Sequence, residues 1–356
     1  MKIAINGFGR MGRCIARIIL AREQAGEDIQ LVGINDIANA QNLAYLFGRD
    51  SIHRAPNFCV ELDAQQQTNH LIITPTANID FAPTHIDSTK NSFKKRIPLF
   101  ACANPKELDF GALGAEVVVE SSGRFLTTDE VAHHLEKGAQ KVIISAPAKD
   151  STPTFVLGVN HTQYKGEPII SNASCTTNCL APIAMLLERE FGILKASLST
   201  IHSYTNDQQL LDVPHRSDKR RSRAAGLNII PTTTGAAKAL YKVLPTLKDK
   251  IHGHSLRVPV PDVSMVDLNA YLAKSASAQS INELFEEESK GALKGILGID
   301  KDFGVSSDFL GDSRSSIVAQ DLTFSLGNMS KIMAWYDNEW GYSTRIIDMA
   351  RFILER

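Results

Sequence analysis

A cysteine precedes a run of apolar residues in the middle of the chain. Cys175 lies within the segment Ser171–Cys179, and Leu180 to Leu187 have the composition of a buried helix. A thiol at a helix N-terminus faces unpaired backbone N–H groups and the positive end of the helix dipole, and both favour the thiolate. Because the thiolate is the nucleophilic form, this segment predicts a nucleophile at Cys175. For a cysteine taken alone, the alternative is a buried structural thiol capped by Ser and Thr.

A histidine follows at the end of the next strand pattern. Ala196 to Ile201 have the composition of a strand, and His202 comes directly before the polar residues Ser203 to Asp207. A cysteine and a histidine that meet in space form a nucleophile and its base. The alternative is a histidine with a structural place in the core, and sequence spacing alone does not decide between the two.

Two later segments contain groups that bind anions. His215 to Arg223 form a basic run, and since the net charge is only −1 and no aromatic residues are interleaved, the run favours a phosphorylated substrate over nucleic acid. A solvated surface loop is the alternative. Ile229 to Lys238 form a hydroxyl-rich turn that enters a helix, which is a second arrangement that binds phosphate. Arg257 offers a further guanidinium.

The first residues have the pattern of a dinucleotide-binding unit. A short apolar strand, Lys2 to Ile5, leads into the GxGxxG of Gly7 to Gly12, then a helix pattern and a second strand that ends at Asp36. In this context the glycines let the backbone approach a pyrophosphate at the helix N-terminus, and Asp36 accepts hydrogen bonds from the adenosine ribose. The same carboxylate repels a 2′-phosphate, which favours NAD over NADP. An exposed helix N-cap is the alternative for Asp36.

Further patterns predict the elements that position these groups. Near-continuous Val and Ile runs predict strands of a parallel sheet that is covered on both faces, at 116–120, 141–145 and 155–159. Ser122 to Phe125 follow one such strand, at the edge where a doubly wound sheet binds its ligand. The polar stretch 57–96 is interpreted as strands and loops on the surface of this domain.

The second half predicts a different sheet. Strand patterns at 264–268 and 330–336 indicate an antiparallel or mixed sheet, and a helix from about Tyr342 has apolar residues at the spacing of a packed core helix.

In the first half, His133 and His134 are adjacent and point in different directions on a helix, so they are interpreted as a solvated face rather than a metal site.

Composition excludes several classes of protein. The chain has 356 residues, which suffices for two domains, and its 43% hydrophobic and 22% charged residues indicate a globular protein. Five cysteines without a CxxC pair argue against a disulfide framework and a zinc ribbon, so we expect no metal. The near-neutral charge and the lack of a long apolar stretch predict no nucleic-acid or membrane partner. No signal peptide is expected, and a cytoplasmic protein is the simplest interpretation.

Eight motifs in this chain resemble those of the phosphorylating glyceraldehyde-3-phosphate dehydrogenases. They occur in family order and span almost the whole chain: INGFGRMGR, SAPAKD, SNASCTTNCLAP, IHSYTNDQ, RRSRAA, NIIPTTTGAAK, RVPVPDVSMVDL and WYDNEWGYSTR. The fold implied is α/β, with a Rossmann doubly wound parallel sheet and an α+β catalytic domain with a mixed or antiparallel sheet. The resemblance implies an NAD-binding domain at 1–174, to which a helix at 339–356 returns, and a catalytic domain at 175–338 with an S-shaped loop at 203–225.

The resemblance also implies roles for single residues. Cys175 is the nucleophile that forms a thioester, and His202 is the base that activates it. The family's substrate and phosphate ligands match Ser174, Thr176, Thr205, Arg221, Thr234, Gly235 and Arg257. The cofactor contacts match Gly7, Gly9, Arg10, Met11, Asp36, Ser122, Asn338 and Tyr342. The implied reactants are glyceraldehyde 3-phosphate, NAD and inorganic phosphate, the product is 1,3-bisphosphoglycerate, and the implied assembly is a homotetramer.

A few positions depart from the family pattern. Arg54 follows His53 where the family usually has Gly, the segment between Arg54 and Leu99 is longer, and Ala103 replaces an adenine-side Arg or Lys. These departures leave open a dual use of NAD and NADP. An erythrose-4-phosphate dehydrogenase would share the Cys and His, but is expected to lack the YTND and TTTGAAK signatures. A binding protein that has lost catalysis on this fold is the rival from another class.

Overall fold

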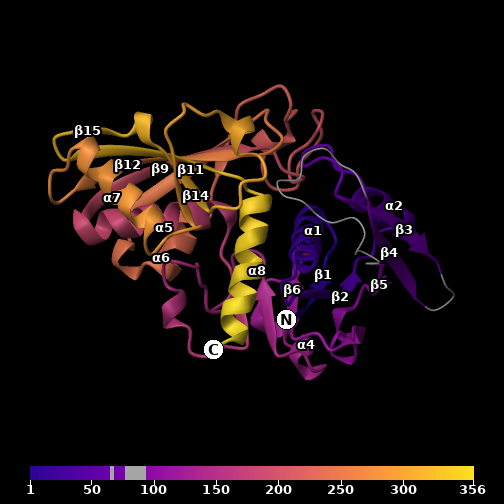
Figure 1. The fold of residues 1–356 in the computed structure, drawn as a ribbon. Coiled ribbons are helices and arrows are strands. Elements are labelled where there is room, and N and C mark those ends of the chain that lie inside the picture. Colours follow the sequence, from indigo (N-terminus) through magenta and orange to yellow (C-terminus); the bar gives the residue numbers. More distant parts are fainter. Residues whose placement is uncertain (65–67, 77–93) are drawn as a thin grey trace.

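The chain forms two large β-sheets flanked by helices (Figure 1), in a computed structural model that describes residues 1–64, 68–76 and 94–356. The first sheet has the strand order β3-β4-β5-β2-β1-β6-β7-β8. The second has the order β10-β11-β9-β12-β16-β14-β13, with β15 paired to β16. Within the described residues, no helix is long and apolar enough to cross a membrane.

The first sheet is parallel from β5 to β8, with an antiparallel extension through β4 and β3. Its strands are β1 (Lys2–Asn6), β2 (Gln30–Asn35), β3 (Phe58–Asp63), β4 (Asn69–Pro75), β5 (Lys95–Phe100), β6 (Val117–Glu120), β7 (Lys141–Ile144) and β8 (Ile169–Ser171). Its helices are α1 (Arg10–Gln24), α2 (Ala40–Phe47), α3 (Thr128–Val131) and α4 (His133–Glu136). Buried apolar clusters cover both faces, which confirms the doubly wound sheet that the Val and Ile runs predicted.

The last helix of the chain belongs to the core of the first sheet. Helix α8 (Trp340–Leu354) lies between the two sheets in Figure 1, where it is drawn in yellow. Ile346, Met349 and Ile353 are fully buried, and they share one apolar cluster with Ile15 of α1. The helix begins two residues before the predicted start at Tyr342, because Asp337 accepts hydrogen bonds from the first free backbone N–H groups.

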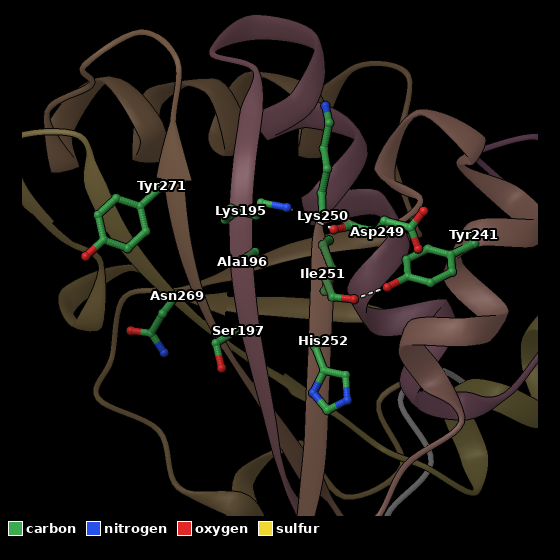
Figure 2. Close-up of a pocket in the computed structure, with 10 residues that line it drawn as sticks. All are labelled: Lys195, Ala196, Ser197, Tyr241, Asp249, Lys250, Ile251, His252, Asn269 and Tyr271. Atoms are coloured by element: carbon green, nitrogen blue, oxygen red, sulfur yellow. Dashed lines mark hydrogen bonds between the residues drawn. The ribbon is translucent and has the colours of Figure 1, made fainter.

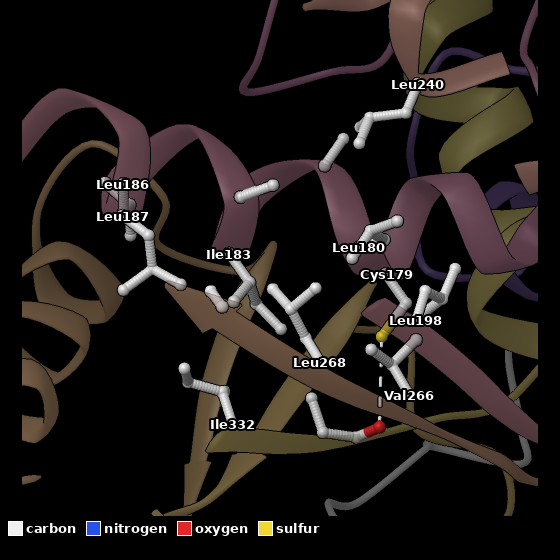
Figure 3. Close-up of a cluster of buried hydrophobic side chains, with 14 of the residues drawn as sticks. Cys179, Leu180, Ile183, Leu186, Leu187, Leu198, Leu240, Val266, Leu268 and Ile332 are labelled. Carbon is white, nitrogen blue, oxygen red and sulfur yellow. Dashed lines mark hydrogen bonds between the residues drawn. The ribbon is translucent and has the colours of Figure 1, made fainter. Parts of the chain in front are cut away.

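The second sheet is mixed, as predicted, and helices cover one of its faces. Its strands are β9 (Ile193–Ser203), β10 (Ile230–Thr233), β11 (Ile251–Val258), β12 (Ser264–Leu272), β13 (Leu297–Asp300), β14 (Ser316–Ala319), β15 (Phe324–Leu326) and β16 (Met329–Tyr336). Its helices are α5 (Cys175–Glu190), α6 (Ala236–Val243) and α7 (Ala278–Lys290). Figure 3 shows Leu180 and Ile183 of α5 against Leu198 and Leu268 of the sheet. Burial of this apolar face holds α5 across the strands.

Single 3₁₀ turns complete the described elements. They are Pro105–Glu107, Gly111–Leu113, His161–Gln163, Arg220–Ser222, Pro245–Leu247, Ser306–Phe309 and Gln320–Leu322. The polar stretch 57–96 forms strands β3, β4 and the start of β5 where it is described, and 65–67 and 77–93 lie outside the described residues. Leu71 and Ile73 of β4 are fully buried, so this stretch extends the core as well as the surface.

Two histidines that were predicted to lie on a solvated helix face are buried instead. His133 and His134 are 4% and 1% exposed, and the His134 ring stacks on Phe110 with ring centroids 5.8 Å apart. Burial lowers the pKa of His134 to about 3, so its ring is neutral. The prediction was wrong because α4 is a single turn within the apolar cluster of Leu108 and Phe110, and tertiary contacts decide its exposure.

The strand predicted at 155–159 does not form. Thr154 makes one isolated bridge with Ser171, and the chain then enters a turn. The side chain of Asn160 accepts a hydrogen bond from Val156 N at 2.8 Å and donates one to Thr154 O at 2.9 Å. Because these backbone groups are bonded to a side chain, they are not available to a neighbouring strand.

Charged side chains from both halves form a buried group, called here the Arg10 cluster. Arg10 at the start of α1 pairs with Glu339, and its Nη1 lies 2.8 Å from Asp50 Oδ2. His53 Nε2 lies 3.1 Å from Glu339 Oε2 and 3.3 Å from Asp262 Oδ2. The side chains of Asp50 and His53 are 1% and 4% exposed. Buried ions are stable only when paired, so the cluster fixes α1 against the residues that precede β12 and α8.

We predict that His53 makes stability fall as pH rises. Burial alone lowers the pKa of His53, but hydrogen bonds with Asp262, Cys14 and Glu339 raise it to about 12. Above pH 7.5 the unfolded chain has lost this proton and the folded chain keeps it, so unfolding releases one proton and the free energy of unfolding falls by about 1.4 kcal/mol per pH unit. Urea unfolding between pH 7.5 and 9 should show this slope reduced in His53→Asn.

The matched control is His252→Asn, since His252 is an exposed histidine on β11. That variant should keep the wild-type slope. An identical slope in His53→Asn and the wild type would show that His53 is not held protonated by the cluster.

Candidate active site

The start of α5 presents Cys175 at the end of a tight turn. Ser174 caps the helix by accepting a hydrogen bond from Thr177 N at 3.2 Å. Asn178 Nδ2 reaches back to Ser174 O at 3.0 Å. Ala173 has a φ of +57°, in the left-handed region, and its carbonyl accepts a hydrogen bond from Tyr342 Oη at 3.0 Å. These bonds hold the strained turn, so the thiol is fixed at the first residue of the helix.

The structure brings His202 to Cys175. His202 lies near the end of β9 and is 6% exposed, and its Nε2 is 3.7 Å from Cys175 Sγ. Its Nδ1 lies 2.8 Å from Ser203 O and 2.7 Å from Arg257 Nη1. Arg257 is directly across from His202 in the parallel pairing of β11 with β9. A thiol, an imidazole and a guanidinium therefore meet at one point.

Burial determines the charge of this pair. Burial raises the pKa of Cys175, and the charge of Arg257 and hydrogen bonds from Thr176 lower it only in part. Burial, followed by the charge of Arg257, lowers the pKa of His202 to about 3. Desolvation therefore acts against the thiolate that the helix N-terminus was expected to favour. The pair is a neutral thiol beside a neutral imidazole.

Thr176 is held by a tyrosine that the sequence analysis missed. Tyr336 at the end of β16 is 1% exposed, and its Oη lies 2.8 Å from Thr176 Oγ1 and 3.1 Å from Thr200 Oγ1. The three hydroxyls link α5, β9 and β16. Tyr336 is 160 positions from Thr176, and no local periodicity marks a contact at that distance.

The predicted substrate and phosphate ligands lie on several elements of the second half. Arg257 lies at His202, as described, while Arg221 pairs with Asp207 and donates to Thr232 Oγ1 at 2.6 Å. The Arg221 side chain is 20% exposed, which differs from a freely solvated loop residue. The other five predicted ligands lie at the start of α5, in the loop after β9 and in the turn before α6: Ser174, Thr176, Thr205, Thr234 and Gly235. Asp207 was not predicted, although it precedes the basic run in the same loop.

A cavity of about 220 Å³ lies at the carboxyl ends of β1, β2 and β6. Its lining includes four predicted cofactor residues, which are Gly7, Gly9, Asp36 and Ser122. A Cβ at Gly7 would lie 2.3 Å from Ser122 N, and one at Gly9 would meet no atom within 4 Å. Asp36 accepts hydrogen bonds from Phe8 N at 2.7 Å and Ala38 N at 2.9 Å. The close backbone, the open position at Gly9 and the fixed carboxylate fit an adenosine pyrophosphate.

The other predicted cofactor residues are not part of the lining recorded for this cavity. Arg10 belongs to the Arg10 cluster, and Met11 packs against the first core. Asn338 Oδ1 accepts hydrogen bonds from Ser203 Oγ at 3.0 Å and Ser264 Oγ at 2.6 Å. Tyr342 holds the turn before Cys175, as described. The cavity lining also includes Cys102, which sequence reasoning missed although it closely follows β5, and Arg124, which lies in the segment Ser122 to Phe125 that the sequence predicted at this edge.

A larger cavity, of about 550 Å³, lies away from this chemistry. It is on the face of the second sheet opposite α5, and Figure 2 shows Ser197, His252 and Asn269 along its strands. Neither Cys175 nor His202 is in its lining. Size alone therefore does not locate the catalytic site in this fold.

The sequence matches two parts of one family. Residues 1–128 match "Glyceraldehyde 3-phosphate dehydrogenase, NAD binding domain", and residues 174–338 match "Glyceraldehyde 3-phosphate dehydrogenase, C-terminal domain". The chain belongs to the glyceraldehyde-3-phosphate dehydrogenase family. NAD is the cofactor of this family's first domain, which contains the 220 Å³ cavity.

Relatives from distant organisms cover nearly the whole chain. The glyceraldehyde-3-phosphate dehydrogenase of Helicobacter pylori is 49% identical over 99% of both chains. That of Bacteroides fragilis is 46% identical over 99% of both chains. The cytosolic glyceraldehyde-3-phosphate dehydrogenase of Pinus sylvestris is 46% identical over 98% of this chain and 96% of its own. These names do not favour the erythrose-4-phosphate alternative.

We predict that Tyr336→Phe destabilises the protein and lowers its activity. Loss of the hydroxyl leaves two buried threonine hydroxyls without this partner, which costs about 1–3 kcal/mol in the free energy of unfolding. Thr176 is adjacent to Cys175, so the dehydrogenase rate should also fall. Tyr271→Phe is the matched control, because Tyr271 is 55% exposed on the outer face of the same sheet. Urea unfolding and initial rates measure both effects, and wild-type values for Tyr336→Phe would contradict the role of this bridge.

Proposed function

We propose that this chain catalyses the oxidation of glyceraldehyde 3-phosphate with NAD and inorganic phosphate to 1,3-bisphosphoglycerate. The observation that carries the proposal is the 3.7 Å contact between Cys175 Sγ and His202 Nε2 at the start of α5, next to Arg257, in a member of this family. A nucleophile beside its base can form a covalent intermediate with an aldehyde.

His202 and Cys175 act together in the first step. In the tautomer with Nδ1–H directed to Ser203 O, Arg257 Nη1 donates to Ser203 O, at 3.0 Å, and not to Nδ1, and the Nε2 atom of His202 is free to accept the thiol proton as Cys175 Sγ attacks the aldehyde carbon. Because the proton leaves as the carbon–sulfur bond forms, the buried thiol does not have to ionise before it attacks. The backbone N–H of Cys175 and the protonated His202 then stabilise the developing oxyanion. NAD, when bound, supplies the hydride acceptor.

The product of oxidation on the protein is a thioester at Cys175. Inorganic phosphate attacks this thioester, and Arg221 and Arg257 are the proposed guanidinium ligands of the two phosphate groups. Thr234 and Gly235 at the start of α6, with Ser174, Thr176 and Thr205, are proposed to complete the binding of these groups. Exclusion of water before phosphate arrives preserves the acyl group for transfer.

The geometry of Asp36 supports NAD over NADP. Its carboxylate is fixed in the cavity by the backbone N–H groups of Phe8 and Ala38, and it cannot turn away from a 2′-phosphate without breaking both bonds. The negative charges of the Asp36 carboxylate and of a 2′-phosphate bound in this cavity would repel each other.

A cytoplasmic homotetramer is proposed as the working form. The family resemblance supports the tetramer, and so do apolar side chains exposed in and after the loop 203–225. Leu210, Leu211, Leu227 and Ile229 are 84%, 67%, 83% and 67% exposed. Exposed apolar groups of this kind are typical of surfaces that contact another subunit.

Plant relatives named as cytosolic support the cytoplasmic location. We also propose the domain boundaries at 1–174 and 175–338, with α8 packed on the first domain.

Cys175→Ser should lose essentially all dehydrogenase activity, because a serine hydroxyl is a much weaker nucleophile near neutral pH. His202→Asn should lower the rate roughly a hundredfold, within the usual range for general-base catalysis. The matched control is Cys179→Ala, which removes a buried thiol one turn further along α5. Initial rates with NAD and phosphate measure these effects. Substantial turnover by Cys175→Ser would refute the thioester mechanism.

Arg221→Ala should separate a phosphate ligand from a surface charge. Loss of a charge-assisted hydrogen bond of about 1.5–3 kcal/mol lowers kcat/KM for glyceraldehyde 3-phosphate roughly tenfold to a hundredfold. The loss should be much smaller with unphosphorylated glyceraldehyde. The control is Arg223→Ala in the same loop, whose side chain is 61% exposed. If Arg221→Ala behaves like the control with both aldehydes, Arg221 is not a phosphate ligand.

A further inference from the structure

A chain of buried hydrogen bonds runs beneath the 220 Å³ cavity. It passes from Cys102 through Asn35, Asn6 and Glu120 to Ser122, across the carboxyl ends of the neighbouring strands β2, β1 and β6. Asn6, Asn35 and Glu120 are 2%, 4% and 1% exposed. Four members of the chain also line the cavity, and Glu120 is the fifth, directly beneath Ser122. The proposed catalytic mechanism makes no use of this carboxyl group.

The direction of each hydrogen bond from Cys102 to Glu120 Oε2 is fixed from one end. Cys102 N donates to Asn35 Oδ1 at 2.8 Å, and Asn35 Nδ2 donates to Cys102 O at 3.0 Å, so the backbone sets the orientation of the Asn35 amide. Asn35 Nδ2 also donates to Asn6 Oδ1 at 2.8 Å. Asn6 must then present its Nδ2 to Glu120 Oε2, at 2.6 Å. The Oε2 atom of Glu120 is therefore an acceptor in either protonation state.

A proton on Glu120 must lie on its other oxygen. Oε1 accepts a hydrogen bond from Ser122 N at 2.9 Å and contacts Ser122 Oγ. When Glu120 is ionised, Ser122 Oγ–H donates inward to Oε1. When Glu120 is protonated, Oε1–H donates to Ser122 Oγ, and the serine hydroxyl hydrogen is released toward the cavity. Ser122 Oγ can still accept from Arg124 N, at 3.2 Å, in both arrangements.

The surroundings favour the protonated form. Among the described residues, no cation is recorded within ion-pair distance of Glu120, and burial raises its pKa to about 7 despite hydrogen bonds from Ser122 and Asn6. An anionic pyrophosphate at the start of α1 would add negative charge nearby and favour the neutral acid further. The charged group recorded as acting on it is Glu130 of α3, whose negative charge raises the pKa of Glu120 further.

We propose that Glu120 is a positioning residue of the cofactor site, which carries a proton in the NAD complex and so directs the Ser122 hydroxyl hydrogen to the cofactor. This inference rests on the NAD binding of the proposed function. NAD binding then takes up a proton above neutral pH, and affinity falls as pH rises. With a free-protein pKa near 7, the Kd for NAD increases about tenfold between pH 6 and pH 8.

Calorimetric titration of the full chain with NAD tests the proposal without turnover. Titrations at pH 6, 7 and 8, in two buffers of different ionisation enthalpy, give both the Kd and the number of protons taken up. The wild type should show the tenfold change and an uptake that approaches one proton at pH 8. Glu120→Gln has no proton to bind, so its Kd should be the same at all three pH values. Glu116→Gln, at the other end of the same segment, should keep the wild-type pH dependence.

A second variant decides the matter if Glu120→Gln does not fold. Ser122→Ala removes the hydroxyl whose hydrogen the protonated Glu120 directs to the cofactor. Because Glu120 is mostly protonated at pH 6 and mostly ionised at pH 8 in the free protein, the factor by which Ser122→Ala raises the Kd for NAD above the wild-type value should be several-fold larger at pH 6 than at pH 8. A pH-independent Kd in the wild type, an unchanged pH dependence in Glu120→Gln, or an equal loss in Ser122→Ala at both pH values would overturn the role of Glu120. Absence of NAD binding at every pH would overturn this role and the cofactor of the proposed function together.

Discussion

The pairing of buried charges around Arg10 is the constraint on which the arrangement of the two sheets depends. Arg10 begins α1, at the cofactor end of the first sheet, while Glu339 and Asp262 adjoin strands of the second. A buried ion that loses its partner destabilises the fold by several kcal/mol, so separation of these elements would carry a large free-energy cost. The consequence is that the N-terminus of α1, next to the 220 Å³ cavity, and the N-terminus of α5, which carries Cys175, keep a fixed relation. The catalytic geometry therefore depends on residues that take no part in the chemistry.

Burial has two opposite effects at the reactive centre. It holds Cys175, His202 and Arg257 within short range of one another, on adjoining elements of the second sheet and its covering helix. The same loss of solvent keeps the thiol and the imidazole neutral. Glu120 at the cofactor end is similar, since it is buried and, within the part of the chain that the structure describes, its recorded partners are the neutral donors of Asn6 and Ser122.

Local signals in the sequence located most of the elements around the site, but long-range contacts did not follow from them. The glycines from Gly7 to Gly12, the apolar run after Cys175 and the strand before His202 are recognisable because turn, helix and strand patterns involve neighbouring residues. His133, His134 and 155–159 were misjudged because Phe110 and the Asn160 side chain decide their structure. The bonds of Tyr336 with Thr176 and of Asn6 with Glu120 join positions 160 and 114 apart. Each of those residues is ordinary in its own segment, so no pattern marks it.

The position of α8 affects how the chain can fold as it is synthesised. Residues Trp340–Leu354 are made long after β1, yet they fill the core of a sheet whose first strand is Lys2–Asn6. Arg22 of α1 also pairs with Asp348 of α8 at 2.7 Å. The amino-terminal sheet therefore emerges from the ribosome with an open apolar face, which closes only after the second sheet has been translated. A nascent chain of this architecture must remain unaggregated with that face exposed, so a late folding step joins α8 to α1, two helices that are far apart in the sequence.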